Sequence, residues 1–186
     1  MKKILISLAA FALAFSGLAA SPASAATSAA AVAPDSDDLR IVRVGTDAMG
    51  ADSYSNRNRE YVTFKNVSDH AVDIANVLVE DNWAHGRTLA NRSHSCNTYK
   101  ITDLPDNSTT ELAAGEYVTV FNGVRAGGDH KAGSEYRLYA DSDVDCGTAG
   151  QFYNNDADTA WVTTAAGVEL AKKSWDWNGG YHVYGH

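Results

Sequence analysis

A stretch near the C-terminal end, Phe152 to Val162, changes from a polar corner into an alternating strand. The corner holds two asparagines and two aspartates, residues that hydrogen-bond their own backbone and tolerate left-handed conformations. Directly after it, residues 159–164 alternate between two faces with a period of two, as a β-strand does. A polar corner that begins a strand is typical of a β fold and does not indicate catalysis.

Short alternating segments of the same kind recur along the chain. The segment 71–83 slips in phase near Asn76, which predicts a bulge or a corner there. No segment has sustained helical periodicity, and residues 49–58, 84–108 and 123–134 are predicted to be loops. Short strands with polar turns at regular spacing predict an all-β sandwich. The predicted strands are 39–45, 60–65, 71–83, 116–122, 136–140, 160–164 and 168–174, and a further short strand, 99–104, is predicted inside the loop 84–108.

The first residues have the pattern of an export signal. Lys2 and Lys3 form a basic start, an apolar run follows to Ala20, and the segment ends as Ala-x-Ala at Ala25. This predicts a secretory signal peptide over residues 1–25 and an extracellular mature protein. An uncleaved membrane anchor is the alternative, because the apolar run approaches spanning length.

The remaining chain divides into three parts. Residues 26–37 are rich in alanine and lack periodicity, which predicts a disordered leader. Residues 38–174 are long enough for one domain with one hydrophobic core. Residues 175–186 form a C-terminal tail that is rich in aromatic side chains.

The chain has two cysteines, Cys96 and Cys146. Because the protein is expected to be exported, we predict a disulfide between them. Closing a loop of about 50 residues would stabilise the fold by about 4 kcal/mol on the chain-entropy account. A pair of free thiols is the alternative, but no Cys-x-x-Cys motif supports a catalytic role.

The charge balance argues against nucleic acid as a partner. The chain carries 15 basic and 23 acidic side chains, a net charge of −8. Loss of the two lysines of the signal would leave 13 basic side chains against 23 acidic ones, a net charge of −10. Phosphate binding needs clustered lysines and arginines, and the longest basic run is Lys172-Lys173.

Three motifs carry a resemblance to a known family. They are Glu60–Asn66, Leu112–Gly115 with the strand after it, and the corner Tyr153–Ala160, followed by Gly167 in the last hairpin. In these motifs and in their order, residues 38–174 resemble a lamin-tail domain, the immunoglobulin-like sandwich of nuclear lamins and many exported bacterial proteins. The matching motif residues are Glu60, Asn66, Gly115, Asn154, Asn155, Asp158 and Gly167.

The chain departs from the family pattern in two places. Ala157 stands where the family usually has glycine, and the loop between Trp83 and Leu112 is longer than the family needs. The resemblance implies an immunoglobulin-like fold and a binding or accessory role. It implies no catalytic residues.

Acidic residues near the polar corner suggest a calcium site. Asp141, Asp143 and Asp145 alternate as oxygen ligands do in a calcium loop. The EF-hand loop is excluded, because its sixth and twelfth positions are Cys146 and Phe152. A looser site that shares Asp156 and Asp158 is one interpretation, and a solvated acidic turn is the other.

The tail offers candidate binding residues. Trp175, Trp177, Tyr181 and Tyr184 lie within ten residues of one another. Aromatic rings with polar tips suit a sugar or a partner surface, because they combine contact area with hydrogen bonding. The alternative is that Trp175 and Trp177 lie on one strand face and cap the core.

These observations predict a secreted, non-catalytic binding or structural module, with a polysaccharide or protein at the cell surface as partner and no cofactor. An extracellular hydrolase, or its accessory domain, is the alternative, with His85 or His94 acting near Asp81. A calcium-dependent adhesion module is a third interpretation.

Overall fold

The computed structural model describes residues 30–46, 56–92, 97–106, 109–140, 153, 157–176 and 183–185 of the 186-residue chain. Within these ranges the chain consists mostly of β-strands, joined by turns and a few short helices. The prediction of an all-β fold is confirmed. The predicted signal peptide, residues 26–29 of the predicted leader and both cysteines lie outside the described residues, whereas residues 30–37 of the leader lie within them.

The larger sheet has six strands among the described residues, in the order β12-β1-β2-β7-β9-β8. Neighbouring strands run antiparallel except β7 and β9, which run parallel. The strands are β12 (Val183–Gly185), β1 (Leu39–Gly45), β2 (Tyr61–Asn66), β7 (Tyr117–Phe121), β9 (Glu135–Tyr139) and β8 (His130–Ala132).

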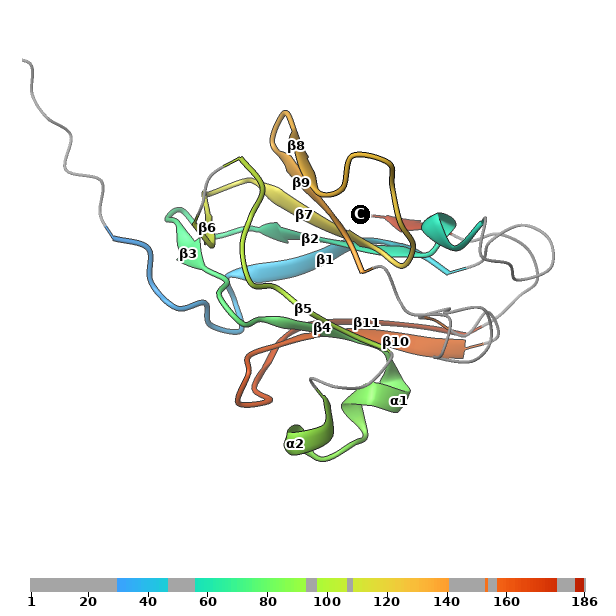
Figure 1. The fold of residues 1–186 in the computed structure, drawn as a ribbon. Coiled ribbons are helices and arrows are strands. Elements are labelled where there is room, and N and C mark those ends of the chain that lie inside the picture. Colours follow the sequence, from blue (N-terminus) through green and yellow to red (C-terminus); the bar gives the residue numbers. More distant parts are fainter. Residues whose placement is uncertain are drawn as a thin grey trace, which may run out of the picture.

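A second sheet has the order β11-β10-β4-β5, and a short pair joins β3 to β6. Figure 1 shows the two larger sheets as two layers, with β1, β2, β7 and β9 on one side and β4, β5, β10 and β11 on the other. β1 and β11 contact each other where the layers approach. The strands are β11 (Glu169–Asp176), β10 (Ala157–Thr163), β4 (Leu78–Glu80), β5 (Thr98–Lys100), β3 (Val72–Asp73) and β6 (Glu111–Leu112).

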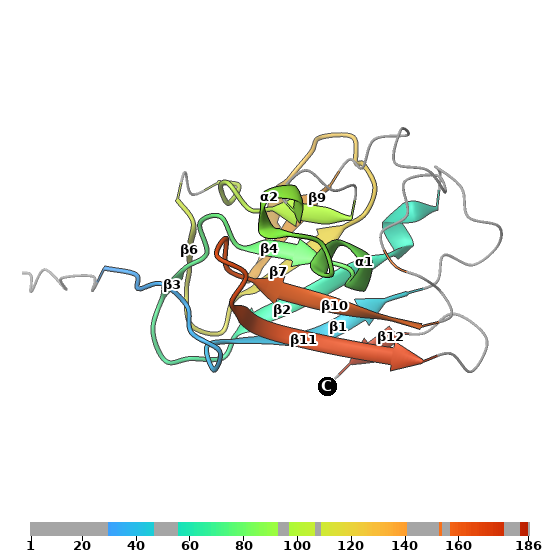
Figure 2. The ribbon, with the colours of Figure 1, turned by 90° about the horizontal axis from the view of Figure 1, so that it is seen from below.

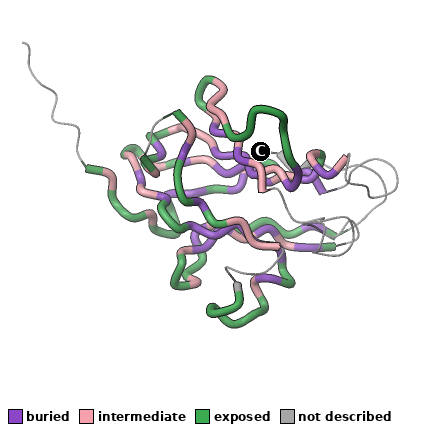
Figure 3. The backbone as a smooth tube through the Cα atoms, viewed as in Figure 1, coloured by how far each residue is buried: buried purple, intermediate pink, exposed green. Residues whose placement is uncertain are grey.

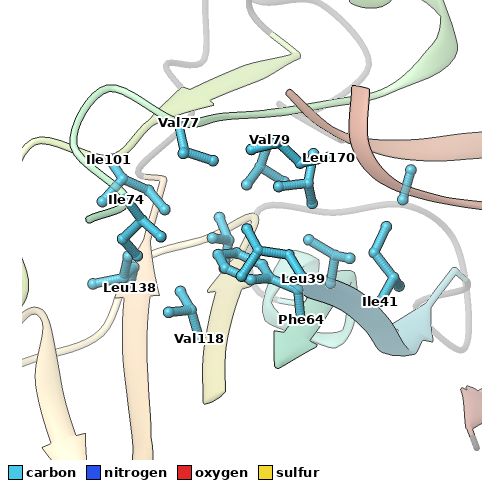
Figure 4. Packing of buried hydrophobic residues seen from close by; sticks show 14 of the residues in the cluster. Leu39, Ile41, Phe64, Ile74, Val77, Val79, Ile101, Val118, Leu138 and Leu170 are labelled. Atoms are coloured by element: carbon cyan, nitrogen blue, oxygen red, sulfur yellow. The ribbon is translucent and has the colours of Figure 1, made fainter. Parts of the chain in front are cut away.

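The hydrophobic core lies between the two layers. Val79 and Leu170 of the smaller sheet face Leu39 and Phe64 of the larger sheet (Figure 4). Figure 3 shows buried positions along the strands of both layers, whereas the connecting loops are largely exposed. Each fully buried valine, leucine or phenylalanine contributes roughly 1.5–3 kcal/mol by leaving water.

The phase slip near Asn76 is a corner between sheets. Asn76 has a positive φ of 61°, a left-handed conformation that asparagine tolerates better than most residues. Its backbone N–H donates to the carbonyl of Ile101 at 2.8 Å. The chain therefore leaves β3 in the short pair and enters β4 in the four-stranded sheet.

Short helices occupy parts of the predicted loops: η1 (Arg57–Arg59), α1 (Asn82–His85) and α2 (Leu89–Arg92). Each covers about one turn or less, so none is long enough to show helical periodicity in the sequence. α1 packs against β4 and β10 on the side of the smaller sheet that faces away from the larger sheet (Figures 1 and 2). No helix in the described ranges is long and apolar enough to cross a membrane.

Several motif residues hold turns and strand ends. The buried side-chain amide of Asn66 donates to the carbonyls of His70 and Leu112 at 2.8 and 2.9 Å. Gly115 and Gly167 both have φ of +81°, a left-handed conformation that glycine adopts without a steric penalty. Glu60 is fully buried and accepts a hydrogen bond from the side chain of Asn122 at 2.8 Å. Asn154 and Asn155 lie outside the described residues.

Three of the described strands were not predicted. β6 lies just before the predicted strand 116–122, β8 lies inside the segment expected to be a glycine-rich loop, and β12 lies in the C-terminal tail. Each has two or three residues, too few to show alternation. The strand order is therefore a result of pairing between distant segments rather than of local pattern.

Candidate functional site

Aromatic side chains form a row on the outer face of the larger sheet. Tyr61, Phe121 and Tyr139 are cross-strand partners on β2, β7 and β9. The ring centroids of Tyr61 and Phe121 are 5.6 Å apart, and those of Phe121 and Tyr139 are 5.1 Å apart. His130 extends the row from β8, with its ring 6.1 Å from that of Tyr139. All four side chains are half-buried. We call them the aromatic row.

Gly45 allows the aromatic row to extend over β1. It is the cross-strand partner of Tyr61. A Cβ atom at Gly45 would lie 2.6 Å from the Tyr61 ring and 2.5 Å from the carbonyl oxygen of Arg59. Only glycine leaves room for the ring at this close approach.

A polar network lies beside the aromatic row on the same face. The buried hydroxyls of Thr63 and Thr119 are 2.8 Å apart, and Thr119 donates to Oε1 of Glu135. Since a hydroxyl has one hydrogen to donate, the Thr63 hydroxyl must donate to Thr119. Arg43 binds Oε1 of Glu135 at 3.0 Å, and Arg137 binds Oε2 at 2.9 Å. One carboxylate therefore holds two guanidinium groups.

The electrostatics of this network keep Glu135 ionised. Burial raises the pKa of Glu135, but hydrogen bonds from Thr119 and Arg137 and the charges of Arg137 and Arg43 lower it, and the net shift is downward. The side chains of Arg43 and Arg137 remain 46% and 40% exposed. Both arginines can therefore donate further hydrogen bonds toward solvent.

A recess of about 360 Å³ lies at one end of the aromatic row. The Oδ1 atom of Asp129 accepts a hydrogen bond from the backbone N–H of Tyr139 at 2.8 Å. Burial is the main cause that raises the pKa of Asp129. Arg125 contacts the ring of His130, with 2.9 Å between Nη1 and Nδ1. The recess is lined by Val124, Arg125, Gly128, Asp129 and Tyr139.

The smaller sheet has a different arrangement on its outer face. Trp161 lies between its cross-strand partners Glu80 and Lys172. The ring of His85, from α1, lies flat on Trp161, with centroids 3.9 Å apart and planes 7° from parallel. Glu80 is fully buried, accepts a hydrogen bond from the Thr163 hydroxyl at 3.2 Å, and lies 3.4 Å from Nδ1 of His85.

This arrangement differs from the expected pairing of a histidine with Asp81. His85 pairs with Glu80, whereas Asp81 is the N-cap of α1 and accepts hydrogen bonds from the backbone of Ala84 at 2.6 Å and from the side chain of Asn97. The second candidate, His94, lies outside the described residues.

Of the candidate calcium ligands, the structure describes Asp158. Its Oδ1 atom accepts hydrogen bonds from the backbone N–H groups of Asn82 at 3.0 Å and Thr159 at 2.7 Å. This oxygen therefore holds the start of α1 against β10. No group of three or more metal-ligating side chains occurs in the described part of the chain. The other four candidates, Asp141, Asp143, Asp145 and Asp156, lie outside it.

Trp175 does not belong to an exposed tail. It is 5% exposed, and its ring meets that of Tyr153 edge to face at 5.4 Å. A ligand has no access to a side chain in this position, so Trp175 is a core residue, as the alternative interpretation holds. Trp177 and Tyr181 lie outside the described residues, and of Tyr184 only the backbone in β12 is described.

The aromatic row was missed by sequence reasoning. The alternation places Tyr61, Phe121 and Tyr139 on one face of their own strands, but it contains no information on which strands are neighbours. Each of these strands has an aromatic residue on its outward face. This signal predicts the aromatic row only when the strand order is known.

The sequence matches no protein-family model and no curated protein.

Proposed function

We propose that this chain is a secreted, non-catalytic binding module of lamin-tail type, built on an immunoglobulin-like sandwich, which binds a polymer at the cell surface. The aromatic row on the outer face of the larger sheet is the observation that carries the proposal. Half-buried rings on an open sheet face offer contact area at low cost in conformational entropy.

The fold part of this proposal is supported by the two packed layers and by the motif residues. Asn66 ties the end of β2 to β6, and the glycines at 115 and 167 have the left-handed conformation that their turns need. Export is supported by the pattern of residues 1–25, and the pair Cys96 and Cys146 fits an oxidising compartment.

The surroundings of His85 support a binding module over a hydrolase. The Glu80 carboxylate is buried under α1. The Thr163 hydroxyl that contacts it is also fully buried. A nucleophile has to reach its substrate, and this hydroxyl is enclosed by protein. The contacts of His85 with Trp161 and Glu80 instead hold α1 on the sheet.

A pull-down of the purified chain on insoluble cell-wall and plant polysaccharides tests the proposal. We expect Tyr139→Ala to weaken binding by about tenfold, the effect of losing one central aromatic contact. Trp83→Ala is the matched control, because Trp83 is 56% exposed on α1, away from the aromatic row. Circular dichroism checks that both variants fold.

Two results would contradict the proposal: absence of binding by the unchanged chain, or equal binding by folded Tyr139→Ala. If Tyr139→Ala does not fold, the double variant Tyr61→Phe, Tyr139→Phe keeps the rings and removes only their hydroxyl groups. It is then expected to fold and to bind more weakly than the unchanged chain.

A further inference from the structure

The outer face of β1, β2, β7 and β9 is basic, although the chain is acidic. The chain has a net charge of −8. On this face, Arg40 and Lys65 are cross-strand partners and therefore point to the same side. Arg43 and Arg137 lie on the same face. Among the described residues of β1, β2, β7 and β9, this face therefore carries these four basic side chains and one acidic side chain, Glu135.

The pair Arg40 and Lys65 is unfavourable by itself. Like charges directly opposite each other on neighbouring strands destabilise a sheet. Neither side chain has an acidic partner in the described part of the chain; Lys65 lies over the ring of Tyr117, with Nζ 5.1 Å from the centroid. A bound anion would relieve this repulsion.

Arg43 and Arg137 are positioned to take an anion. Glu135 holds both guanidinium groups and neutralises one of their two charges. Arg43 uses one terminal nitrogen and Arg137 uses Nε and one terminal nitrogen, so each keeps N–H groups that point elsewhere. Guanidinium groups that are already oriented bind an oxyanion with less loss of conformational entropy.

The geometry of the aromatic row distinguishes between polyanions. The planes of Phe121 and Tyr139 are 13° from parallel at 5.1 Å, a separation too short for two rings side by side in one plane. The rings therefore stack on each other, and their edges are left for a ligand. Single-stranded nucleic acid binds by stacking bases on open ring faces, which this row does not offer between its members.

We propose that this face binds a polysaccharide that carries carboxylate or sulfate groups. The anionic groups bind Arg43 and Arg137, with Arg40 and Lys65 beside them, and the sugar chain lies across the edges of the aromatic row. This inference rests on the proposed function, because it names the class of polymer that the same face recognises.

Affinity electrophoresis of the full chain tests the inference with three pairs of probes. The probes are polygalacturonate and its methyl ester, dextran sulfate and dextran, and single-stranded DNA with and without added salt. We expect polygalacturonate or dextran sulfate to bind and its uncharged counterpart to bind at least about tenfold more weakly, with affinity falling as salt rises.

The double variant Arg43→Gln, Arg137→Gln is expected to lose about tenfold or more in affinity for the acidic polymer. Arg87→Gln, Lys100→Gln is the matched control, because it removes the same charge from the side of the smaller sheet, where Arg87 lies against Trp83 of α1 and Lys100 lies on β5. This control is expected to bind within about twofold of the unchanged chain, since its charges lie away from the outer face of the larger sheet.

The outcomes separate the inference from the proposed function. Equal binding to polygalacturonate and its methyl ester overturns the inference but leaves a binding module. Tighter binding of DNA that is lost in the arginine variant overturns it in favour of nucleic acid. No binding to any polymer contradicts the proposed function itself. If the arginine variant does not fold, Arg40→Gln, Lys65→Gln replaces it, with the same expected loss and the same contrary results.

Discussion

The rings of Tyr153 and Trp175 meet edge to face, with centroids 5.4 Å apart and planes at 78°. Tyr153 begins the predicted polar corner, and Trp175 lies near the end of β11. Burial raises the pKa of the Tyr153 hydroxyl, and the negative charges of Asp81 and Asp158 raise it further. The contact joins the corner to β11 through Trp175, a residue that the sequence indicates as a candidate for ligand binding.

Trp175→Ala should destabilise the protein by about 3–5 kcal/mol, because it leaves a large cavity in the core. Urea denaturation measures the free energy of unfolding. Trp83→Ala, an exposed tryptophan on α1, should change it by less than about 0.5 kcal/mol. A small effect of Trp175→Ala would mean that the ring is not part of the core.

Asp81 should make stability depend on pH. Burial is the largest cause that raises its pKa, from 3.8 to about 6; hydrogen bonds from Ala84 and Asn97 lower it, and the charges of Asp158 and Glu80 raise it. Between these two values the folded protein holds a proton that the unfolded chain has released. The free energy of unfolding therefore falls as pH rises through this window. Above about pH 6 the stabilising contribution of protonated Asp81 is lost.

Asp81→Asn tests this dependence, because asparagine caps a helix as well as aspartate does and carries no charge. The variant loses the oxygen that accepts from Asn97 at every pH, but it carries no charge that opposes folding at pH 7, so its stability relative to the unchanged chain should rise by about 1–3 kcal/mol between about pH 4 and pH 7. Thermal melts between about pH 4 and pH 7 should show a flatter profile for the variant. Parallel profiles for the two proteins would exclude Asp81 as the source.

Asn66→Ala should lower the free energy of unfolding by about 2–4 kcal/mol, because it removes the donor to two carbonyls and the acceptor for Ser68. Chemical denaturation measures this free energy. Asn91→Ala is a matched control, since Asn91 is exposed on α2. The same small change in both variants would show that the Asn66 network adds little.

Gly45→Ala should destabilise the fold by about 1–3 kcal/mol, because the new methyl group would overlap the Tyr61 ring and the carbonyl of Arg59. At Gly86, by contrast, the nearest atom to an added Cβ lies at 3.4 Å, so Gly86→Ala should be tolerated. If Gly45→Ala is as stable as Gly86→Ala, the Tyr61 ring does not need this approach.

His85→Ala should weaken the packing of α1 on the sheet. The change removes the ring on Trp161 and one contact of the buried Glu80 carboxylate, which predicts a loss of about 1–3 kcal/mol. Tryptophan fluorescence should also change, because the exposure of Trp161 increases. An unaltered spectrum and an unaltered unfolding free energy would contradict this role.

The sequence by itself determined those features that depend on neighbours along the chain. The period of two in residues 39–45 predicts β1 with the bounds that the structure has, and the slip at Asn76 marks the corner between β3 and β4. The last hairpin, β10 to β11, also follows from local pattern. Alternation and turn chemistry act over a few residues, so they can be recognised without the tertiary structure.

Only the tertiary structure decided which faces meet. The aromatic row joins residues 61, 121 and 139, and Glu135 binds Arg43 across 92 positions of sequence. Strand order and register depend on hydrogen bonds between distant segments and on the burial of one sheet face against another. The same packing put Trp175 in the core and left Trp83 exposed, although both are tryptophans near polar residues.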